Sequence, residues 1–408
     1  ASISLIDTTA RAYVDDEVVV DADGTVLVQA TTKMPVVTVS GNVAGSAGGA
    51  IGIGNSTLIT HEAVTAEIGD NAVITARGNG SGLTANTGTM TGDVFDTETV
   101  HGLAVIATSF EEITSVAASG AFAGKMGVAG SAVVTLLNED TIASIGSGTT
   151  INASNSGASA IQDVATRASS VSKLLGIGGS LAVGLGFGGV GAGVDVAVVD
   201  KTVLAWNAAA TVNALGDIVV TADSAEDFRS ISAAIGIGST VGIAGSAGVY
   251  VLDIAAQALV GNPILGAAGR VSSATGSGQT LVAEGNVVVQ ATADLELDVI
   301  AGSVSAAGSG SFGAAGAVPI VTKTVESFIA GGALVTGLGT RATSDVINGE
   351  FTVSFVDPGG MFSVNPTAAV DAGSDSVTFA TDHGTKTGDA LFYDANGGGV
   401  IGGLTDQT

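Results

Sequence analysis

The chain has 408 residues, a formal net charge of −26 and no cysteine. Only 12 residues are Lys or Arg, and phosphate binding requires clustered positive charge, so nucleic acid is excluded as a partner. The lack of cysteine excludes disulfide bonds and thiolate metal sites. The 46% of hydrophobic residues, chiefly Ala, Val, Ile and Leu, suffice to bury a core built from small side chains.

The chain opens as Ala-Ser-Ile-Ser-Leu-Ile, in which the first five residues alternate apolar and polar side chains, as a strand does. A motif of the form Gly-x-apolar-x-apolar-x-Ala, with small variations, then recurs and predicts a turn followed by a β-branched strand. Its five copies span residues 24–30, 70–76, 148–153, 216–222 and 285–291. Their terminal alanines are 46, 77, 69 and 69 residues apart, which predicts a solenoid with a coil of about 23 residues and one insertion. Some 15 such coils, stacked about 4.8 Å apart, would form a rod of roughly 70 Å.

Gly- and Ala-rich apolar stretches, each followed by a polar turn, lie between these strands. They span residues 40–69, 117–146, 176–207, 233–261 and 301–331. In the third stretch, Leu181 and Val183 fall on one face of a strand, whereas Ala182 and Gly184 fall on the other. A glycine face lets another backbone approach closely, so the pattern predicts two sheets packed tightly face to face.

Residues 174–194 carry no charge and are long enough to cross a bilayer as a helix. Nine of them are glycines, and each glycine costs a helix roughly 1 kcal/mol. Their hydrophobic alternation also has a period of two, which favours a strand. The segment is therefore predicted to be a strand, and the chain is not expected to span a membrane.

The composition changes near residue 350, where the Gly- and Ala-rich stretches stop and aromatic residues become more frequent. We therefore expect two domains: a β-solenoid array over residues 1–349, and a small, truncated β module over residues 350–408. The predicted fold class is all-β, an elongated parallel β-solenoid followed by that module.

Several of these segments resemble parts of giant bacterial β-strand-repeat surface proteins. The resemblance rests on residues 10–14, on the strand at 216–222, on Ala-Gly-Ser-Ala blocks such as residues 129–132, and on a module from His383 to residue 405. It implies an elongated parallel β-solenoid in an adhesin-like or fibrous protein, located outside the cell or on its surface. It implies no catalytic residue.

The function expected from these observations is that of a structural segment in a giant secreted surface protein, forming a stiff fibre or an adhesin stalk. Partners would be other coils, through end-to-end self-association or continuation of a longer chain, and cell-surface glycans. One alternative is an adhesin module that binds glycan or Ca²⁺, for which Phe392 and Tyr393 are the candidate aromatic platform. A second alternative is a solenoid enzyme that acts on polysaccharides.

Few residues are candidates for chemistry. His61, His101 and His383 are far apart in sequence and lack the flanking motifs of a catalytic triad, so no enzymatic activity is expected. Asp21 and Asp23 precede a glycine and form half of a calcium loop without its remaining ligands. They are the candidate Ca²⁺ ligands, and the simpler interpretation is a solvated acidic turn. No other cofactor is expected.

Overall fold

The computed structural model describes residues 1–92, 94–266 and 269–340, together with residues 370–371 and 376–377. The chain divides into two compact units, Ala1–Ile347 and Asn348–Thr408. Of the second unit, only two short antiparallel strands are described, β23 (Val370–Asp371) and β24 (Ser376–Val377). The rest of the small module predicted from residue 350, including His383, Phe392 and Tyr393, lies outside the described residues.

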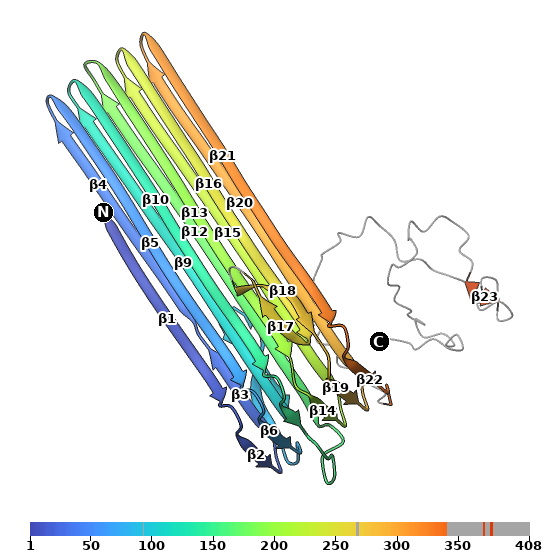
Figure 1. Ribbon diagram of the computed structural model, residues 1–408. Helices are drawn as coiled ribbons and strands as arrows, with labels where there is room; N and C mark the ends of the chain where they lie inside the picture. The colour runs from blue at the N-terminus through green and yellow to red at the C-terminus, as the bar shows by residue number, and fades with distance from the viewer. Residues whose placement is uncertain (93, 267–268, 341–369, 372–375, 378–408) are drawn as a thin grey trace, which may run out of the picture. The chain divides into compact units, whose positions relative to one another are not determined.

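The first unit is an all-β solenoid of three parallel sheets, which confirms the predicted fold class for this part of the chain (Figure 1). Sheet A consists of β1 (Ser2–Val14), β5 (Gly49–Ile68), β10 (Met126–Ile145), β13 (Gly188–Asn207), β16 (Val241–Val260) and β21 (Gly310–Ile329). Sheet B consists of the short strands β2 (Val19–Ala22), β6 (Val73–Ala76), β11 (Thr150–Ile151), β14 (Thr211–Ala214), β19 (Thr280–Ala283) and β22 (Leu334–Gly337). Sheet C consists of β3 (Val26–Thr31) and β4 (Met34–Ser46), which both pair with β9 (Gly102–Ala123), followed by β12 (Asp163–Gly184), β15 (Ile218–Gly238) and β20 (Val287–Ala307).

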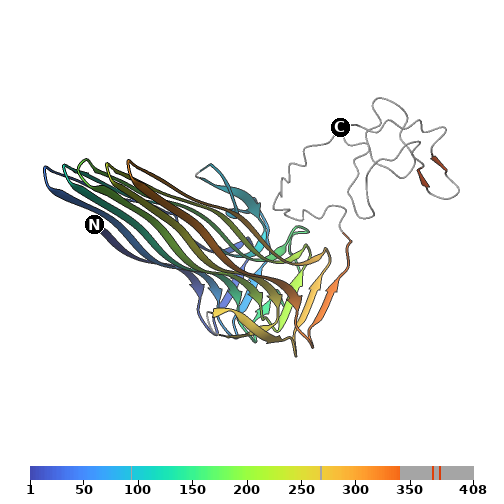
Figure 2. The same cartoon turned by 90° about the horizontal axis from the view of Figure 1, so that it is seen from above.

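The chain passes repeatedly from a strand of sheet C to one of sheet A and then to one of sheet B. We call the turns that join sheet C to sheet A the arch end, and the end that carries sheet B the base (Figure 2). The strands of sheets A and C run between these two ends for about 20 residues, or roughly 66 Å. Six stacked strands give a height of only about 29 Å. The long dimension of this unit therefore follows the strands, and the expected rod of many short stacked coils is wrong.

The short coil predicted from the motif spacing is also wrong. One turn separates the paired residues Gly188 and Val241, which are 53 positions apart, and the longest turn separates Gly49 from Met126, 77 positions apart. The motif spacing differs from the coil length for a physical reason. Ala30 and Ala222 end their motifs in sheet C and Ala76 ends its motif in sheet B, yet all three enter the same core. The spacing of 46 therefore joins two sheets within one turn and is not a multiple of a shorter coil.

Sheets A and C pack face to face, and the size of the residues between them changes from the arch end to the base. Near the arch, the interior consists largely of Gly, Ala and Ser. A Cβ added to Gly127 would lie 2.6 Å from the carbonyl oxygen of Val183 in the opposite sheet, and one on Gly178 would lie 2.5 Å from that of Val194. The predicted close approach of two backbones across a glycine face is therefore present.

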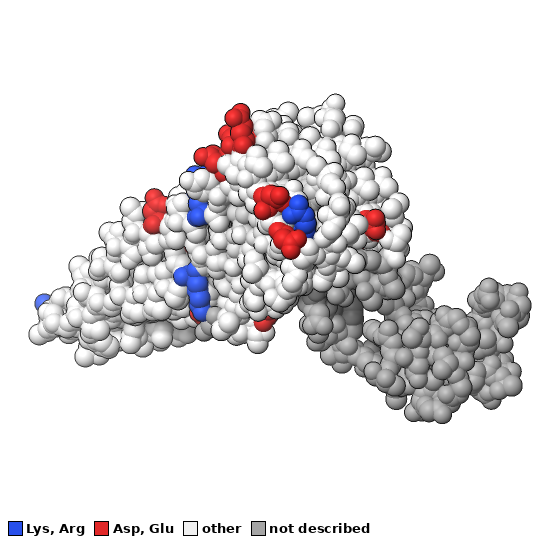
Figure 3. Space-filling model, turned by 90° about the horizontal axis from the view of Figure 1, so that it is seen from below, with Lys and Arg blue, Asp and Glu red and all other residues white. Residues whose placement is uncertain are grey.

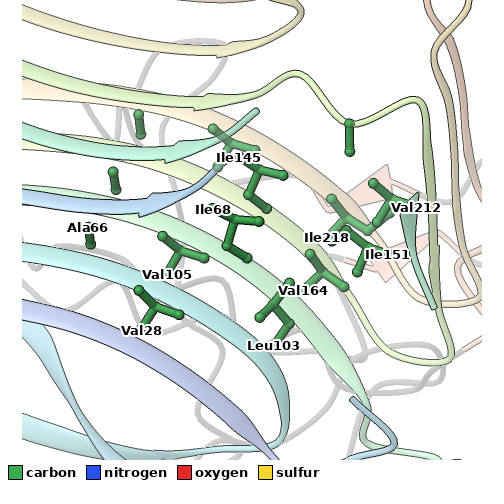
Figure 4. Close-up of a cluster of buried hydrophobic side chains, with 14 of the residues drawn as sticks. Val28, Ala66, Ile68, Leu103, Val105, Ile145, Ile151, Val164, Val212 and Ile218 are labelled. Carbon is green, nitrogen blue, oxygen red and sulfur yellow. The ribbon is translucent and has the colours of Figure 1, made fainter. Parts of the chain in front are cut away.

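Larger side chains fill the interior nearer the base. Leu58, Ile113, Leu174 and Phe228 belong to a cluster in the middle of the strands, where each is at most 2% exposed. The main core lies at the base, where sheet B closes the coil into three sides (Figure 4). There the successive coils stack aliphatic side chains in ladders such as Ile68 on Ile145.

Two hairpins interrupt the coils and cover the outside of the base. β7 (Leu83–Thr91) and β8 (Val94–Val100) pack Ala85 and Val100 against Ile106 on the outer face of sheet C. β17 (Asn262–Leu265) and β18 (Val271–Thr275) bring Val271 against Leu259 on the outer face of sheet A. Both outer faces are thus covered at the base by the chain itself. Within the part of the chain that is described, no helix is long and apolar enough to cross a membrane.

Candidate functional site

A cluster of ionisable side chains is buried between sheets A and C, on the base side of the middle apolar cluster. Sheet A contributes Glu62, Glu139 and Lys201, which are neighbours in register on β5, β10 and β13. Sheet C contributes Glu111, Ser172 and Glu226, which are neighbours on β9, β12 and β15. Five of these six residues are at most 1% exposed and Glu226 is 4% exposed. We call this set the buried charge ladder.

Lys201 lies at the centre of the ladder. Its Nζ is 3.0 Å from Glu226 Oε1 and 3.5 Å from Glu139 Oε2, and it donates a 2.7 Å hydrogen bond to Ser172 Oγ. Ser172 Oγ lies 2.7 Å from Glu111 Oε2 and 3.0 Å from Glu139 Oε2. Lys201 and Ser172 together thus link carboxyl groups from three strands, two of them on the facing sheet.

The electrostatics set Lys201 and Glu139 apart from Glu62 and Glu111. Burial alone lowers the pKa of Lys201, but the charges of Glu139 and Glu226 outweigh it and raise that pKa above its usual range, so Lys201 stays charged. Burial raises the pKa of Glu139, and the Lys201 charge reverses the effect, so the net shift is downward. Glu139 is therefore ionised at neutral pH.

Glu111 and Glu62, which form no ion pair with Lys201, behave in the opposite way. Burial, followed by the charge of Glu139, raises the pKa of Glu111 well above its usual range. Burial chiefly, and the charge of Glu139 to a lesser degree, raises the pKa of Glu62 to about 7, although Thr32 donates a hydrogen bond to it. A carboxyl group without a cation beside it keeps its proton, because a buried charge without a partner is costly.

The ladder is suited to holding coils in register rather than to turning over a substrate. A general base must reach the proton that it removes, and these side chains are enclosed by both sheets. A slip of β13 by two residues toward the arch would move Lys201 from its neighbour Glu139 to a position beside the buried Leu137. The ion pairs thus fix the register of strands that are rich in glycine toward the arch, and register is weakly specified in Gly-rich strands.

A second buried polar group lies nearer the arch. Asp195 accepts hydrogen bonds from Ser230 Oγ at 2.5 Å and from the Tyr250 hydroxyl at 3.0 Å. Burial raises the pKa of Asp195 to about 6 despite these two bonds. Its carboxylate occupies the space that Gly176 leaves empty, because a Cβ there would meet both Asp195 oxygens. This group also links the two sheets across the interior.

The predicted calcium ligands lie at the base, and the next coil occupies both of them. Asp21 pairs with Arg77 at 2.6 Å, and Asp23 Oδ1 accepts a 3.0 Å hydrogen bond from Asn79. Within the described ranges, no group of three or more His, Asp or Glu side chains gathers in a way that could hold a metal ion. Ca²⁺ binding at Asp21 and Asp23 stays a prediction.

The histidines that the structure describes have separate surroundings. His61 Nδ1 is 2.7 Å from Asn138 Oδ1 on the outer face of sheet A. His101 Nδ1 is 3.2 Å from the carbonyl oxygen of Gly78 at the base.

A shallow cleft of about 490 Å³ lies between β18 and β21, and Glu326 is the only titratable residue of its lining. The structure thus does not bring His61, His101 and this cleft into one site.

The outer surface is charged unevenly. Asp and Glu side chains cluster over the base half, whereas the part toward the arch end, at the left of Figure 3, is largely uncharged. On sheet C the last charged positions before the arch are Arg229, which pairs with Asp227 at 3.3 Å and Glu296 at 3.3 Å, and Asp298. Beyond them, the outer faces of both sheets carry mainly Val, Ile, Leu and small residues.

The buried charge ladder was not predicted from the sequence. Its signal was a charged residue on the inward side of an alternating apolar strand, as at Lys201, which shares its face with Val199 and Val203. Glu111 and Lys201 are 90 positions apart, and only the register of the strands brings them together.

Comparison with known protein families, with curated proteins and with solved structures finds no match to this chain.

Proposed function

We propose that this chain is a structural segment of a secreted bacterial surface protein, in which it forms part of a stiff extracellular fibre or stalk. The observation that supports the proposal most strongly is the continuity of the three sheets through all the described coils. Each turn is joined to the next along whole strands, for example through all 20 residues of β13 paired with β16. Such a stack resists bending because every coil is hydrogen-bonded to its neighbours along its whole length.

The interior supports the same role. Lys201 and the carboxylates around it tie neighbouring coils and facing sheets together, and each carboxylate comes from a different strand. Replacing a buried ion pair by apolar residues is often neutral for stability, so we infer that the ladder serves the arrangement of the coils. A fibre assembled from many similar coils needs that specificity, because a slipped register would propagate along the stack.

The ends of the described stack indicate how such segments could join. β20, β21 and β22 form the edges of their sheets at one end, and β1, β2, β3 and β4 form the edges at the other. Edge strands present unpaired N–H and C=O groups that favour pairing with further strands. Further coils, of the same polypeptide or of another copy, would continue the sheets there, and cell-surface glycans remain the proposed target of the whole protein.

Immunogold electron microscopy of intact cells that produce the chain tests this function. Antibodies raised against residues 1–340 should label fibres or a layer outside the cell without permeabilisation. Matched sections of permeabilised cells show whether any label is inside. Label confined to the cytoplasm would contradict the proposal, as would release of reducing sugars from polysaccharides incubated with the purified chain.

A further inference from the structure

The outer face of sheet C toward the arch end is apolar and uncovered. We define the outer tip face as four rows of outward side chains that cross β4, β9, β12, β15 and β20 in register. Its first two rows, from the arch inward, are Gly45, Phe122, Val183, Ile237 and Ala306, then Val43, Gly120, Leu181, Ile235 and Val304. The next two are Gly41, Ala118, Gly179, Ala233 and Gly302, then Val39, Val116, Ile177, Ile231 and Ile300. Val43 is 76% exposed and Val304 is 61% exposed.

The faces of a parallel sheet are normally covered by other parts of the protein or by a partner. Sheets of parallel strands occur almost only where both of their faces are buried. At the base this chain follows the rule, because the hairpin β7–β8 packs against Ile106 and its neighbours on the outside of sheet C. Among the described residues, no equivalent element covers the outer tip face. A patch of this kind on a folded protein marks an interaction site.

The third row gives the face its shape. A Cβ added to Gly41, Gly179 or Gly302 would meet no atom within 4 Å, so packing inside the chain does not require glycine there. Glycine within a strand costs roughly 0.5–1 kcal/mol relative to alanine, and it often marks the close approach of another backbone. With Ala118 and Ala233, these glycines form a groove across the outer face of the sheet. A backbone that packs closely against them must therefore approach from outside the solenoid.

The groove and the neighbouring row are complementary to each other. Two residues after each small residue comes a large one, as in Gly179 and Leu181 on β12 or Ala233 and Ile235 on β15. On β9 the second position is Gly120, and the Phe122 ring fills the space there. The Cε2 of Phe122 would lie 3.5 Å from a Cβ added to Gly120. The small row and the large row are adjacent, on the same side of the same strands.

A two-fold axis between these two rows, parallel to the direction of stacking, makes the face self-complementary. It places each small residue of one copy opposite the large residue of the same strand in the second copy: Gly179 opposite Leu181, and Ala233 opposite Ile235. The remaining rows then meet as well, with Ile177 opposite Val183. The arch ends point in opposite directions, so Arg229 and the charged row behind it lie at or past the partner's arch, in water.

The dimensions of the face suit such a contact. Five strands about 4.8 Å apart and four rows about 6.7 Å apart, with their margins, cover on the order of 700 Å². A stable interface buries about 800 Å² on each partner. Lipid is a poorer occupant, because the open edges at β4 and β20 would place unpaired backbone groups in hydrocarbon.

We propose that two copies of this chain pair through the outer tip face of sheet C, with their arch ends pointing in opposite directions. The pairing is lateral and stands independently of the proposed fibre function, because it needs neither sheet edge of the stack. It would join two stacks side by side, so that the groove of each receives the large row of the other.

Sedimentation of the full chain over a range of concentrations tests the pairing. The wild type should show a monomer–dimer equilibrium, and Gly179→Val should weaken dimerisation at least tenfold while its melting temperature stays the same or rises. Ile231→Glu should weaken it further, whereas Thr9→Glu, on the outer face of sheet A, adds the same charge and should change nothing. A wild type that stays monomeric at all concentrations would overturn the proposal, and so would a Gly179→Val chain that dimerises normally. Binding of a monomeric wild type to lipid vesicles would assign the face to membranes instead.

Cross-linking tests the orientation, since the chain has no cysteine of its own. A short bismaleimide should join a Gly179→Cys copy to a Leu181→Cys copy faster than it joins two Lys125→Cys copies, because Lys125 lies at the arch end. Efficient cross-linking through Lys125→Cys alone would show that the arch ends lie together and would contradict the proposed axis.

Discussion

Replacing Lys201 with methionine removes the only cation of the buried charge ladder and keeps most of the side-chain volume. Glu139 and Glu226, which lie 3.5 Å and 3.0 Å from its Nζ, would then be buried without a counter-charge. Breaking a buried pair by removing one partner costs about 3–5 kcal/mol. Part of this cost is avoided if the carboxyl groups take up protons, so the loss should be larger at pH 8 than at pH 5.

Urea denaturation followed by circular dichroism measures this loss. The matched control is Arg11→Met, because the Arg11–Glu67 pair is 3.1 Å long but 54% and 38% exposed and such surface pairs contribute about 0–1 kcal/mol. Adding Glu139→Gln and Glu226→Gln to Lys201→Met should recover most of the stability. A Lys201→Met chain as stable as the Arg11→Met control at pH 8 would refute the account of the ladder.

Three further predictions concern other parts of the chain. Gly184→Val should destabilise the chain by about 1–3 kcal/mol, because its Cβ would meet the backbone of Gly188. The outward Gly179→Val on the same strand should not destabilise it. Equal melting temperatures of the two variants would show that the interior near the arch is looser than described. Glu62 has a pKa raised to about 7, so the folded state keeps a proton that the unfolded state releases near pH 4.5. The free energy of unfolding should therefore fall as the pH rises from 4.5 to 7. Glu62→Gln should remove roughly 3 kcal/mol of that fall. If Asp21 and Asp23 bind Ca²⁺, calorimetric titration should show heat that Asp21→Asn/Asp23→Asn abolishes, and a wild type without heat would eliminate the site.

Much of the local structure could be predicted because it depends on side-chain alternation. The period of two around Leu181 and Gly184 predicts both a strand and its inward face, and glycine on that face requires a neighbouring backbone close by. The structure places Ala182 and Gly184 inside and Leu181 and Val183 outside. The same pattern excluded a membrane helix over residues 174–194, which belong to β12, its arch and β13.

The length of a turn could not be predicted from the spacing of similar motifs. Ala76 and Ala222 end similar motifs, but one lies in sheet B and the other in sheet C, because both sheets border one core. The hairpins β7–β8 and β17–β18 also lengthen two of the turns and blur the period. The buried charge ladder depends on register across strands, so residues as distant as Glu111 and Lys201 give no local sign of their contact.

Residues 1–340 form a stack of full-turn coils, each hydrogen-bonded along its length to the next. Single-molecule stretching between cysteine handles introduced at Ala1 and Thr340 tests it most directly. Coils of 53 to 77 residues should peel off one at a time, each releasing about 190–270 Å of chain. Increments less than half that length, such as the shorter coil predicted from the motif spacing would release, or extension without discrete steps, would contradict the claim.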